Sequence, residues 1–299
     1  MPAATPLPRP AIAAALAAHY SEALRPERAN ARPPARERDF PSVLILLTND
    51  DGIYAPGLAA MERALEGLGD VYVVSPATEQ SGVGHSITYL NPLVVKELFE
   101  GRQRRGWAVE GSPADCVKIG IFEFCPRLPD LVVSGINGGL NAGINVLYSG
   151  TVAAAIEGAF FGITSVAVSL EFDEHARFDR AAALARSVIE QILEKKSSAP
   201  QLYNLNIPTA ALDSAESRLR VVPMGLQRSG EQYEKRVDPR GRSYFWALSD
   251  PVAHASEHET DISALRKGMV TLTPLDFDLT KRAVLAEMEQ WDFELANRG

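Results

Sequence analysis

Short runs of consecutive apolar residues, each followed by a polar or glycine-rich segment, constrain the fold of this chain more than any other feature. The first run is Val43-Leu44-Ile45-Leu46-Leu47, and similar runs lie at 71–74 and 131–133. They show no alternation of polar and apolar residues, which is typical of strands buried on both faces of a parallel sheet. Segments with helical spacing, such as 55–68, lie between them. This order predicts an α/β fold with right-handed crossovers.

The remaining segments fit the same architecture with an additional C-terminal part. Apolar positions at 93–99 and 107–110 flank a polar stretch and predict a hairpin. After residue 207 the expected strands are short and are separated by long polar loops. The further elements that we expect are helices at 113–124, 151–161, 178–196 and 280–291, and strands at 165–170, 218–222, 244–248 and 269–273.

Composition indicates a soluble globular protein without a membrane segment. Of the 299 residues, 46% are hydrophobic and 23% are charged, which is typical of globular domains. No run approaches the ~18 uncharged apolar residues that a membrane-spanning helix needs. The net charge of -8 argues against binding of a nucleic acid polymer, because such proteins cluster Lys and Arg.

The cysteines indicate a cytoplasmic protein. Cys116 and Cys125 form no CxxC pair, so the sequence predicts neither a disulfide framework nor a zinc site. We expect both to be small core residues in a reducing compartment.

The chain divides into an N-terminal extension and one folded unit. Residues 1–41 are rich in Ala, Pro and Arg, and we expect them to be poorly ordered. The segment lacks the long apolar core of a secretory signal. The folded unit is expected at 42–299, with 210–299 as an extension of the α/β core that carries oligomerisation segments.

A pair of adjacent carboxylates follows the first strand, in Thr48-Asn49-Asp50-Asp51-Gly52. Two such groups repel each other unless a cation lies between them. A turn at Gly52 could bring both side chains to one ion. The alternative is an ordinary Asp-Asp-Gly turn with solvated carboxylates.

Two further strand ends carry polar segments, and ligands of open parallel sheets bind beyond the carboxyl ends of the strands. The segment 75–86 is rich in hydroxyls and glycine, and Ser81 within it could ligate Mg²⁺ or Mn²⁺ through oxygen. His85 in the same segment could transfer a proton, although a structural hydrogen bond is the favoured role. The segment 134–143 has four glycines, and Asn137 adds a neutral oxygen ligand.

A helix start is expected to follow at Ser149-Gly150-Thr151. Free amides and the positive end of the helix dipole make such a start a natural phosphate site. Plain N-capping by Ser149 and Thr151 is the alternative.

Other catalytic motifs are missing from the sequence. Neither the P-loop pattern GxxxxGK[ST] nor GxSxG is present, which argues against an ATP-binding P-loop and a hydrolase elbow. His254 and His258 lie four residues apart without forming HExxH, so we interpret them as part of a solvated loop near, at most, the entrance of the site.

Taken in order, these segments resemble the SurE family of survival-protein nucleotidases. The resemblance covers about 42–290 and leaves 1–41 unmatched. The segments that carry it are Leu46–Gly52, Ser75–Thr88, Gly111–Val117, Ser134–Gly143, Tyr148–Val152, Asn204–Pro208 and Gly268–Leu275.

The resemblance implies a Rossmann-like three-layer fold, with a mostly parallel sheet and a C-terminal β-hairpin/helix extension. It implies one divalent metal ion per subunit, Mg²⁺ or Mn²⁺, and C-terminal segments that reach a partner subunit in a homodimer or homotetramer. The implied metal ligands are Asp50, Asp51, Ser81 and Asn137. Phosphate or substrate contacts are expected from Asn49, Gly82, His85, Asn141, Ser149, Gly150 and Thr151.

The activity that the resemblance implies is hydrolysis of nucleoside 5′-monophosphates by metal-assisted attack of water, with possible side activity on 3′-monophosphates. Asp50 and Asp51 are the expected catalytic residues. Asp50 is favoured as the group that positions or deprotonates the water, and an aspartyl-phosphate at Asp50 is the alternative. Two other functions stay open: an exopolyphosphatase acting on short polyphosphate, and a nucleotide-binding protein without hydrolysis.

Overall fold

A nine-stranded sheet forms the centre of the computed structural model, which describes residues 43–195, 199–213, 218–226, 231–249 and 258–293. The strand order is β3-β4-β2-β1-β5-β6-β7-β11-β8, and the strands from β4 to β7 in this order are parallel. The strands of this sheet are β1 (Val43–Thr48), β2 (Gly69–Pro76), β3 (Val95–Glu100), β4 (Gln103–Val109), β5 (Leu131–Gly138), β6 (Thr164–Leu170), β7 (Leu202–Ile207), β8 (Leu219–Val221) and β11 (Val270–Leu275).

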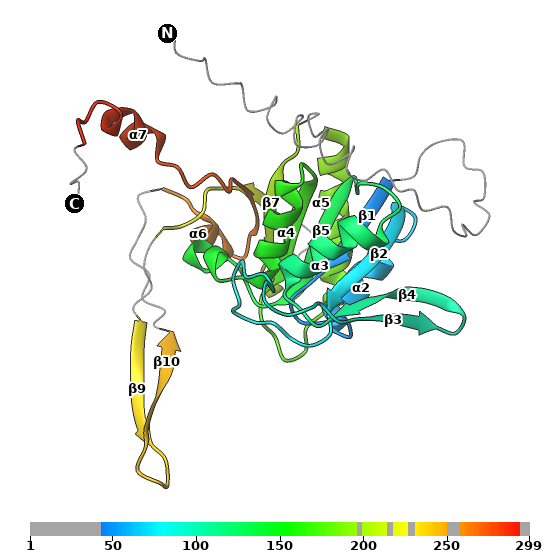
Figure 1. Cartoon of the computed structure of the whole chain (residues 1–299), viewed down its shortest axis with the longest axis horizontal. Coiled ribbons are helices and arrows are strands. Elements are labelled where there is room, and N and C mark those ends of the chain that lie inside the picture. The colour runs from blue at the N-terminus through cyan, green and yellow to red at the C-terminus, as the bar shows by residue number, and fades with distance from the viewer. Residues whose placement is uncertain (1–42, 196–198, 214–217, 227–230, 250–257, 294–299) are drawn as a thin grey trace, which may run out of the picture.

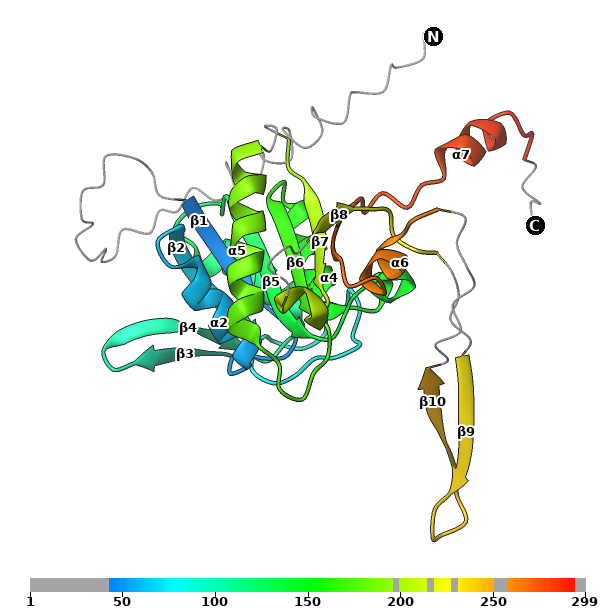
Figure 2. The same ribbon diagram turned by 180° about the vertical axis from the view of Figure 1, so that it is seen from behind.

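Helices cover both faces of this sheet and complete three layers. Helices α2 (Pro56–Leu65) and α5 (Phe178–Lys195) lie on one face, and α3 (Pro113–Ile119) and α4 (Gly150–Phe160) lie on the other (Figures 1 and 2). The predicted α/β fold with a mostly parallel sheet is therefore confirmed.

The uniformly apolar strands serve both layers of helices at once. Successive side chains of a strand point to opposite faces. In β1, Ile45 and Leu47 pack in the core with α2 and α5, whereas Leu46 packs with residues of α3 and α4. All three side chains are fully buried. A strand with an alternating pattern would place polar groups against one of the two layers.

The hairpin and the third helix differ in detail from the prediction. The hairpin of β3 and β4 turns at Gly101, where φ is +60°, so β4 already begins at Gln103. The expected helix 113–124 consists of α3 followed by a π-helical turn, Gly120–Phe124. Ser112 and Asp115 form a capping box at the start of α3, which satisfies two backbone amides that the helix leaves free.

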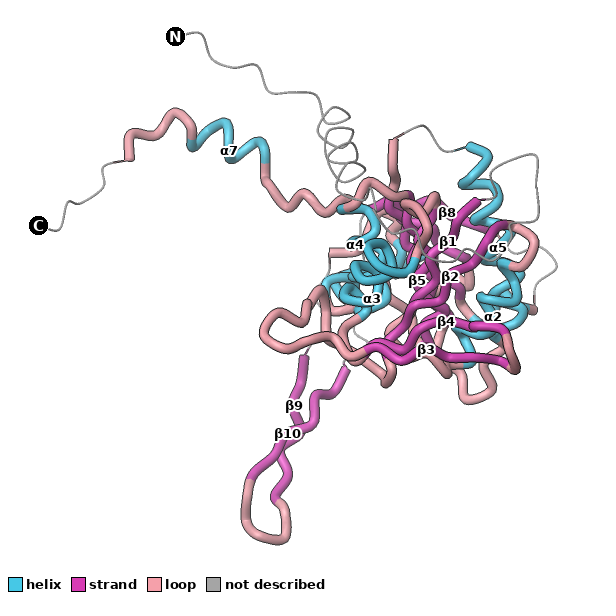
Figure 3. The backbone as a smooth tube through the Cα atoms, turned by 45° about the vertical axis from the view of Figure 1, so that its right-hand side comes forward, coloured by secondary structure: helices cyan, strands magenta, loops and turns pink. Residues whose placement is uncertain are grey.

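The C-terminal part both extends the sheet and leaves it. Strand β11 pairs antiparallel with β7 and parallel with β8, so these strands enlarge the central sheet. Strands β9 (Glu231–Val237) and β10 (Ser243–Ser249) form a separate antiparallel hairpin. This hairpin and helix α7 (Arg282–Met288) project from the body in opposite directions (Figure 3).

Among the described strands and α-helices that follow β7, two were not predicted. Strand β9 reads Glu-Gln-Tyr-Glu-Lys-Arg-Val and has no apolar face, so it lacks the pattern of a packed strand. Helix α6 (Asp261–Leu265) has five residues, which is too short for helical periodicity to be visible. The expected helix 280–291 is present as the shorter α7.

Some predictions fall outside the described part of the chain. The N-terminal extension 1–41 and His254 lie outside it, so the proposed division of the chain stays a prediction. Within the described residues, no helix is both long enough and apolar enough to cross a membrane. Cys116 and Cys125 are both free, and Cys116 is buried in the core, as predicted.

Candidate active site

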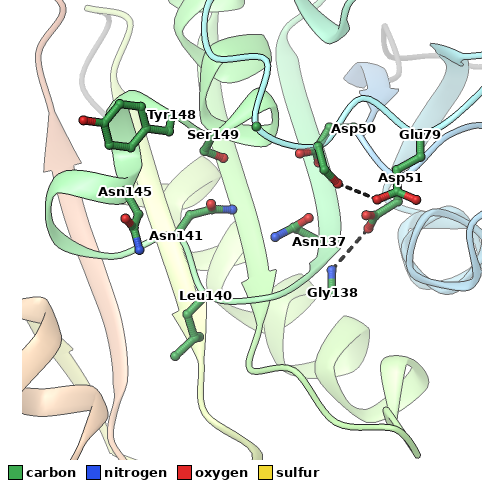
Figure 4. Close-up of a pocket in the computed structure, with 12 residues that line it drawn as sticks. Asp50, Asp51, Glu79, Asn137, Gly138, Leu140, Asn141, Asn145, Tyr148 and Ser149 are labelled. Carbon is green, nitrogen blue, oxygen red and sulfur yellow. Dashed lines mark hydrogen bonds between the residues drawn. The ribbon is translucent and has the colours of Figure 1, made fainter. Parts of the chain in front are cut away.

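A cavity of about 290 Å³ opens at the carboxyl ends of β1, β2 and β5, beside the start of α4 (Figure 4). This is the edge of the sheet where parallel strands of α/β proteins bind their ligands. The residues that line the cavity are Asp50, Asp51, Glu79, Ser81, Gly82, Asn137, Gly138, Leu140, Asn141, Asn145, Tyr148 and Ser149.

Asp50 is the most buried charged group of the cavity. Its side chain is 4% exposed, and burial raises its pKa to about 6. Thr151 opposes this shift because its hydroxyl donates a 2.5 Å hydrogen bond to Asp50 Oδ1, whereas the charge of Asp51 adds to it. Gly150 lies against the carboxylate: a Cβ at this position would be 2.9 Å from Asp50 Cβ. The helix start therefore holds Asp50 by both packing and hydrogen bonding.

Asp51 turns toward the third strand end. Its Oδ2 accepts a 3.2 Å hydrogen bond from the backbone amide of Gly138. Burial raises the pKa of Asp51, the Gly138 hydrogen bond lowers it, and the nearby Glu79 carboxylate raises it again. The two adjacent carboxylates thus face one cavity, and both are harder to ionise than usual, chiefly because burial removes part of their hydration.

The loop after β2 brings Ser81 to the carboxylates. The amide of Gln80 donates to the carbonyl of Asp50 at 2.7 Å, and the amide of Gly84 donates to the carbonyl of Tyr148 at 3.0 Å. Ser81 lies between these two anchors, and its hydroxyl donates to Glu79 Oε1 at 2.6 Å.

Asn137 reaches the cavity from an irregular part of β5. The register of β5 against β6 shifts between Ser134 and Asn137. Such a shift re-aims side chains near the end of a strand. The Asn137 amide nitrogen donates to the carbonyl of Gly139 at 2.6 Å. The side-chain oxygen of Asn137 therefore remains as the acceptor that can face a ligand.

The structure brings three of the seven predicted substrate contacts to the cavity, Gly82, Asn141 and Ser149, and places the other four elsewhere. Gly150 and Thr151 lie behind Asp50 and act on its carboxylate. Asn49 is fully buried, donating to the carbonyl of Gly52 at 3.0 Å and accepting from Ser75. It fixes the turn that aims the two aspartates.

His85 lies beyond the cavity wall. Its Nε2 is 2.6 Å from Glu157 Oε2 on α4, and its ring stacks on Phe160 at a centroid distance of 5.2 Å. This is the structural hydrogen bond that the sequence favoured over proton transfer. The described contacts of the His85 ring are thus with α4 and not with Asp50 or Asp51.

The start of α4 forms another wall of the cavity. The Ser149 hydroxyl accepts a hydrogen bond from the amide of Val152 at 3.1 Å, so Ser149 is the N-cap of α4. Its hydroxyl proton stays free to donate toward the cavity. Capping and phosphate binding are therefore compatible at this residue.

The charge of the cavity identifies the kind of ion that it can hold. Asp50, Asp51 and Glu79 line it, and none of the described lining residues is Lys or Arg. An anionic substrate would be repelled by this wall unless a cation is present. Carboxylate, hydroxyl and amide oxygens are the donors that Mg²⁺ and Mn²⁺ prefer. The residues present fit such an ion.

Within the described residues, no group of three or more His, Cys, Asp or Glu side chains is arranged as a ready metal cluster. The expected set includes only two carboxylates, and the remaining donors are a hydroxyl and an amide. A metal site built from these mixed oxygen donors needs neither a third acidic ligand nor a sulfur ligand.

Sequence reasoning did not select Glu79, Asn145 or Tyr148, although all three line the cavity. Glu79 lies two residues before Ser81 in the same loop, and this proximity was the available signal. Asn145 lies in the turn Gly143–Leu147, and Tyr148 follows this turn directly. The path of the turn across the cavity depends on tertiary packing.

The fold and the cavity define a three-layer α/β protein with an acidic ligand site at the carboxyl edge of its parallel strands. Residues 45–231 match the family model described as survival protein SurE, and the chain belongs to this family. The resemblance inferred from the motifs is thereby confirmed.

Individual relatives cover most of the chain. A protein of Rhodopirellula baltica named 5'-nucleotidase SurE is 60% identical over 249 residues, which span 83% of this chain and 98% of the relative. One of Heliobacterium modesticaldum with the same name is 41% identical over 83% of this chain and 91% of the relative. The crystal structure of the SurE protein from Aquifex aeolicus superimposes with a TM-score of 0.73 at 36% identity, covering 82% of this chain and 98% of that one.

The buried charge of Asp50 makes a prediction about stability. The pKa of Asp50 in the folded protein is raised from 3.8 to about 6. The contribution of Asp50 to the free energy of unfolding is therefore fully present below pH 4 and is lost as the pH rises through 6. Asp50→Asn should therefore unfold at higher denaturant concentration than the wild type at pH 8 without divalent cations. The gain is roughly 3 kcal/mol at most and should vanish near pH 4. Denaturant unfolding in EDTA measures it.

The matched control is Asp179→Asn, the same chemical change in an exposed ion pair with Arg63 on the surface. Such pairs contribute ~0–1 kcal/mol, so this variant should follow the wild type at every pH. A stability gain of Asp50→Asn that is equal at pH 4 and pH 8 would contradict the assigned cause.

Proposed function

We propose that this chain is a divalent-metal-dependent phosphatase that hydrolyses nucleoside 5′-monophosphates to nucleoside and phosphate. The observation that carries the proposal is the cavity itself, where two adjacent carboxylates, the buried Asp50 and the partly buried Asp51, face a helix start and two oxygen-bearing loops. The relatives of Rhodopirellula baltica and Heliobacterium modesticaldum are both named 5'-nucleotidase SurE, which agrees with this proposal.

The residues that would hold the metal are Asp50, Asp51, Ser81 and Asn137. All four line the cavity. The bound ion would supply positive charge for a phosphate oxygen and lower the pKa of a bound water. Mg²⁺ and Mn²⁺ both suit this donor set.

The side chains around this set would bind and orient the phosphate. The Ser149 hydroxyl can donate to a phosphate oxygen while its oxygen still caps α4. The positive end of the α4 dipole and the amides near Gly82 favour the same anion. Asn141 lines the cavity between these groups and completes the wall.

Asp50 is proposed to hold or accept a proton of the attacking water. Its Oδ1 accepts from Thr151, which fixes the plane of the carboxylate and leaves Oδ2 for the water. A bound cation would offset the effect of burial on the pKa of Asp50, so that the carboxylate would be ionised and able to accept a proton.

Loss of either carboxylate should abolish most of the activity. We expect phosphate release from AMP, GMP or CMP to require Mg²⁺ or Mn²⁺, and to fall by about 100-fold or more in Asp50→Asn and Asp51→Asn, since a positioned base alone contributes roughly 10²–10⁴-fold. A colorimetric phosphate assay with and without EDTA measures this.

Asp179→Asn serves again as the matched control and should retain wild-type rates. Metal-independent turnover, or full activity of Asp50→Asn, would refute the proposal. Tight nucleotide binding without any phosphate release would favour a binding protein instead. Faster turnover of short polyphosphate than of any monophosphate would favour an exopolyphosphatase, and 3′-monophosphates in the same panel measure the side activity.

A second experiment separates direct attack by water from an aspartyl-phosphate. An aspartyl-phosphate is an acyl phosphate, which borohydride reduces to the alcohol, whereas direct attack by water never forms this bond. Turnover followed by rapid treatment with borohydride should therefore leave the Asp50 peptide unchanged, as measured by mass spectrometry. Substrate-dependent conversion of Asp50 to homoserine would establish a covalent intermediate.

We further propose that the chain assembles as a homodimer or homotetramer in the cytoplasm, through its C-terminal segments. Helix α7 has no buried residue. The β9–β10 hairpin exposes Tyr233, Phe245 and Trp246, each more than half accessible. Such concentrated apolar surface on projecting segments is typical of interfaces.

Removing the hairpin aromatics should weaken the assembly. The double variant Phe245→Ser/Trp246→Ser is expected to shift from oligomer toward monomer at micromolar concentration, as measured by size-exclusion chromatography with light scattering. Tyr89→Ser provides the control, because Tyr89 is an even more exposed aromatic outside these segments. A monomeric wild type would contradict the proposed assembly.

A further inference from the structure

Strand β7 carries two asparagines in a place where apolar residues would pack better. Asn204 and Asn206 are both fully buried, on the face of the sheet that α4 covers. Burying a carboxamide costs free energy unless its polar atoms find partners. The position of these two residues, next to the active-site loop, indicates what the partners are.

Both asparagines hold the main chain of Asn141. Asn206 Oδ1 accepts from the Asn141 amide at 2.8 Å, and Asn206 Nδ2 donates to the Asn141 carbonyl at 3.1 Å. Asn204 Nδ2 donates to the same carbonyl at 2.7 Å. The backbone of one cavity-lining residue is thereby fixed on both its polar groups.

The hydrogen bonds continue from Asn141 to the carboxylate pair. The Asn141 side-chain nitrogen donates to Ser169 Oγ at 2.8 Å and to Thr151 Oγ1 at 3.4 Å. Thr151 in turn donates to Asp50 Oδ1 at 2.5 Å. A connected chain of buried groups thus runs from β7 to Asp50.

The fold gains little from this polar surface. Thr271 and Thr273 on β11 lie opposite Asn206 and Asn204. Their hydroxyls, like Asn204 Oδ1, are buried without a hydrogen-bond partner among the described residues. Unpaired buried groups are destabilising. Packing in the core therefore does not explain why positions 204 and 206 are asparagine.

A second anchor keeps the loop attached. The buried Asp261 carboxylate accepts from the amide of Gly143 at 2.7 Å. Loss of the β7 contacts would therefore change the orientation of Asn141 while the loop stays connected at Gly143.

We propose that Asn206, assisted by Asn204, is a positioning residue of the active site, which sets the orientation of Asp50 through Asn141 and Thr151. The inference rests on the proposed metal-dependent phosphatase activity. It goes beyond the metal and phosphate contacts, because neither asparagine lines the cavity.

The test compares Asn206→Leu with Thr271→Val. Leucine keeps the branched heavy-atom arrangement of asparagine and removes both contacts with Asn141. Thr271→Val alters the paired residue on β11 at equal burial but breaks no hydrogen bond. For Asn206→Leu we expect kcat to fall by ~10–100-fold with less than a ~3-fold change in the nucleotide KM, and Mn²⁺ affinity to fall by a similar ~10–100-fold. Thr271→Val should keep all three values.

Asn204→Leu, which removes one of the three contacts, should show a smaller loss of kcat and keeps the proposal testable if Asn206→Leu does not fold. Circular dichroism and an unfolding curve establish which variants are folded. Unchanged kcat and Mn²⁺ affinity in a folded Asn206→Leu would overturn the proposal. Failure of both leucine variants to fold, beside a folded Thr271→Val, would also overturn it by assigning the pair to the fold. If the wild type neither binds Mn²⁺ nor releases phosphate, it is the proposed function that fails.

Discussion

The burial of Asp50 beside a second carboxylate is the interaction on which the rest of the site depends. A carboxylate that is 4% exposed loses most of its hydration, and Asp51 adds repulsion to that loss. Each neighbouring segment offsets part of this cost. Thr151 donates a hydrogen bond, the amide of Gly138 neutralises part of the charge on Asp51, and the start of α4 contributes its dipole. The remaining imbalance is what a cation would remove.

The parallel sheet supplies the geometry that this arrangement needs. Strands β1, β2 and β5 are neighbours or next neighbours, so their carboxyl ends meet at one edge. The backbone then locks the three loops together, as in the hydrogen bond from Gln80 to the carbonyl of Asp50. The close approach of α4 to Asp50 also requires glycine at position 150, because any side chain there would collide with Asp50. Rigid strands and mutually bonded loops together give a preorganised site.

The sequence predicted those parts of the protein that local pattern determines. Uniform apolar runs identified β1, β2 and β5, and the polar clusters at their carboxyl ends contain Asp50, Asp51, Ser81 and Asn137, which line a single cavity. The residues whose roles were not predicted are those that depend on tertiary partners, because local pattern does not determine such partners. Asn49 was expected to contact the substrate but fixes a turn, whereas Asn204 and Asn206 were given no role at the site but hold the active-site loop. Strand β9 carries no apolar face because it pairs only with β10 in the described chain.

The lack of Lys and Arg among the described lining residues has a consequence for the kinetics of ligand encounter. Enzymes with basic clefts attract anions over long range, and added salt slows their association. Here the molecule has a net charge of -8 and three carboxylates that line its cavity. An approaching anion is repelled until it reaches the short-range field of the site. Salt screens that repulsion, so moderate ionic strength should speed up ligand capture in this protein instead of slowing it.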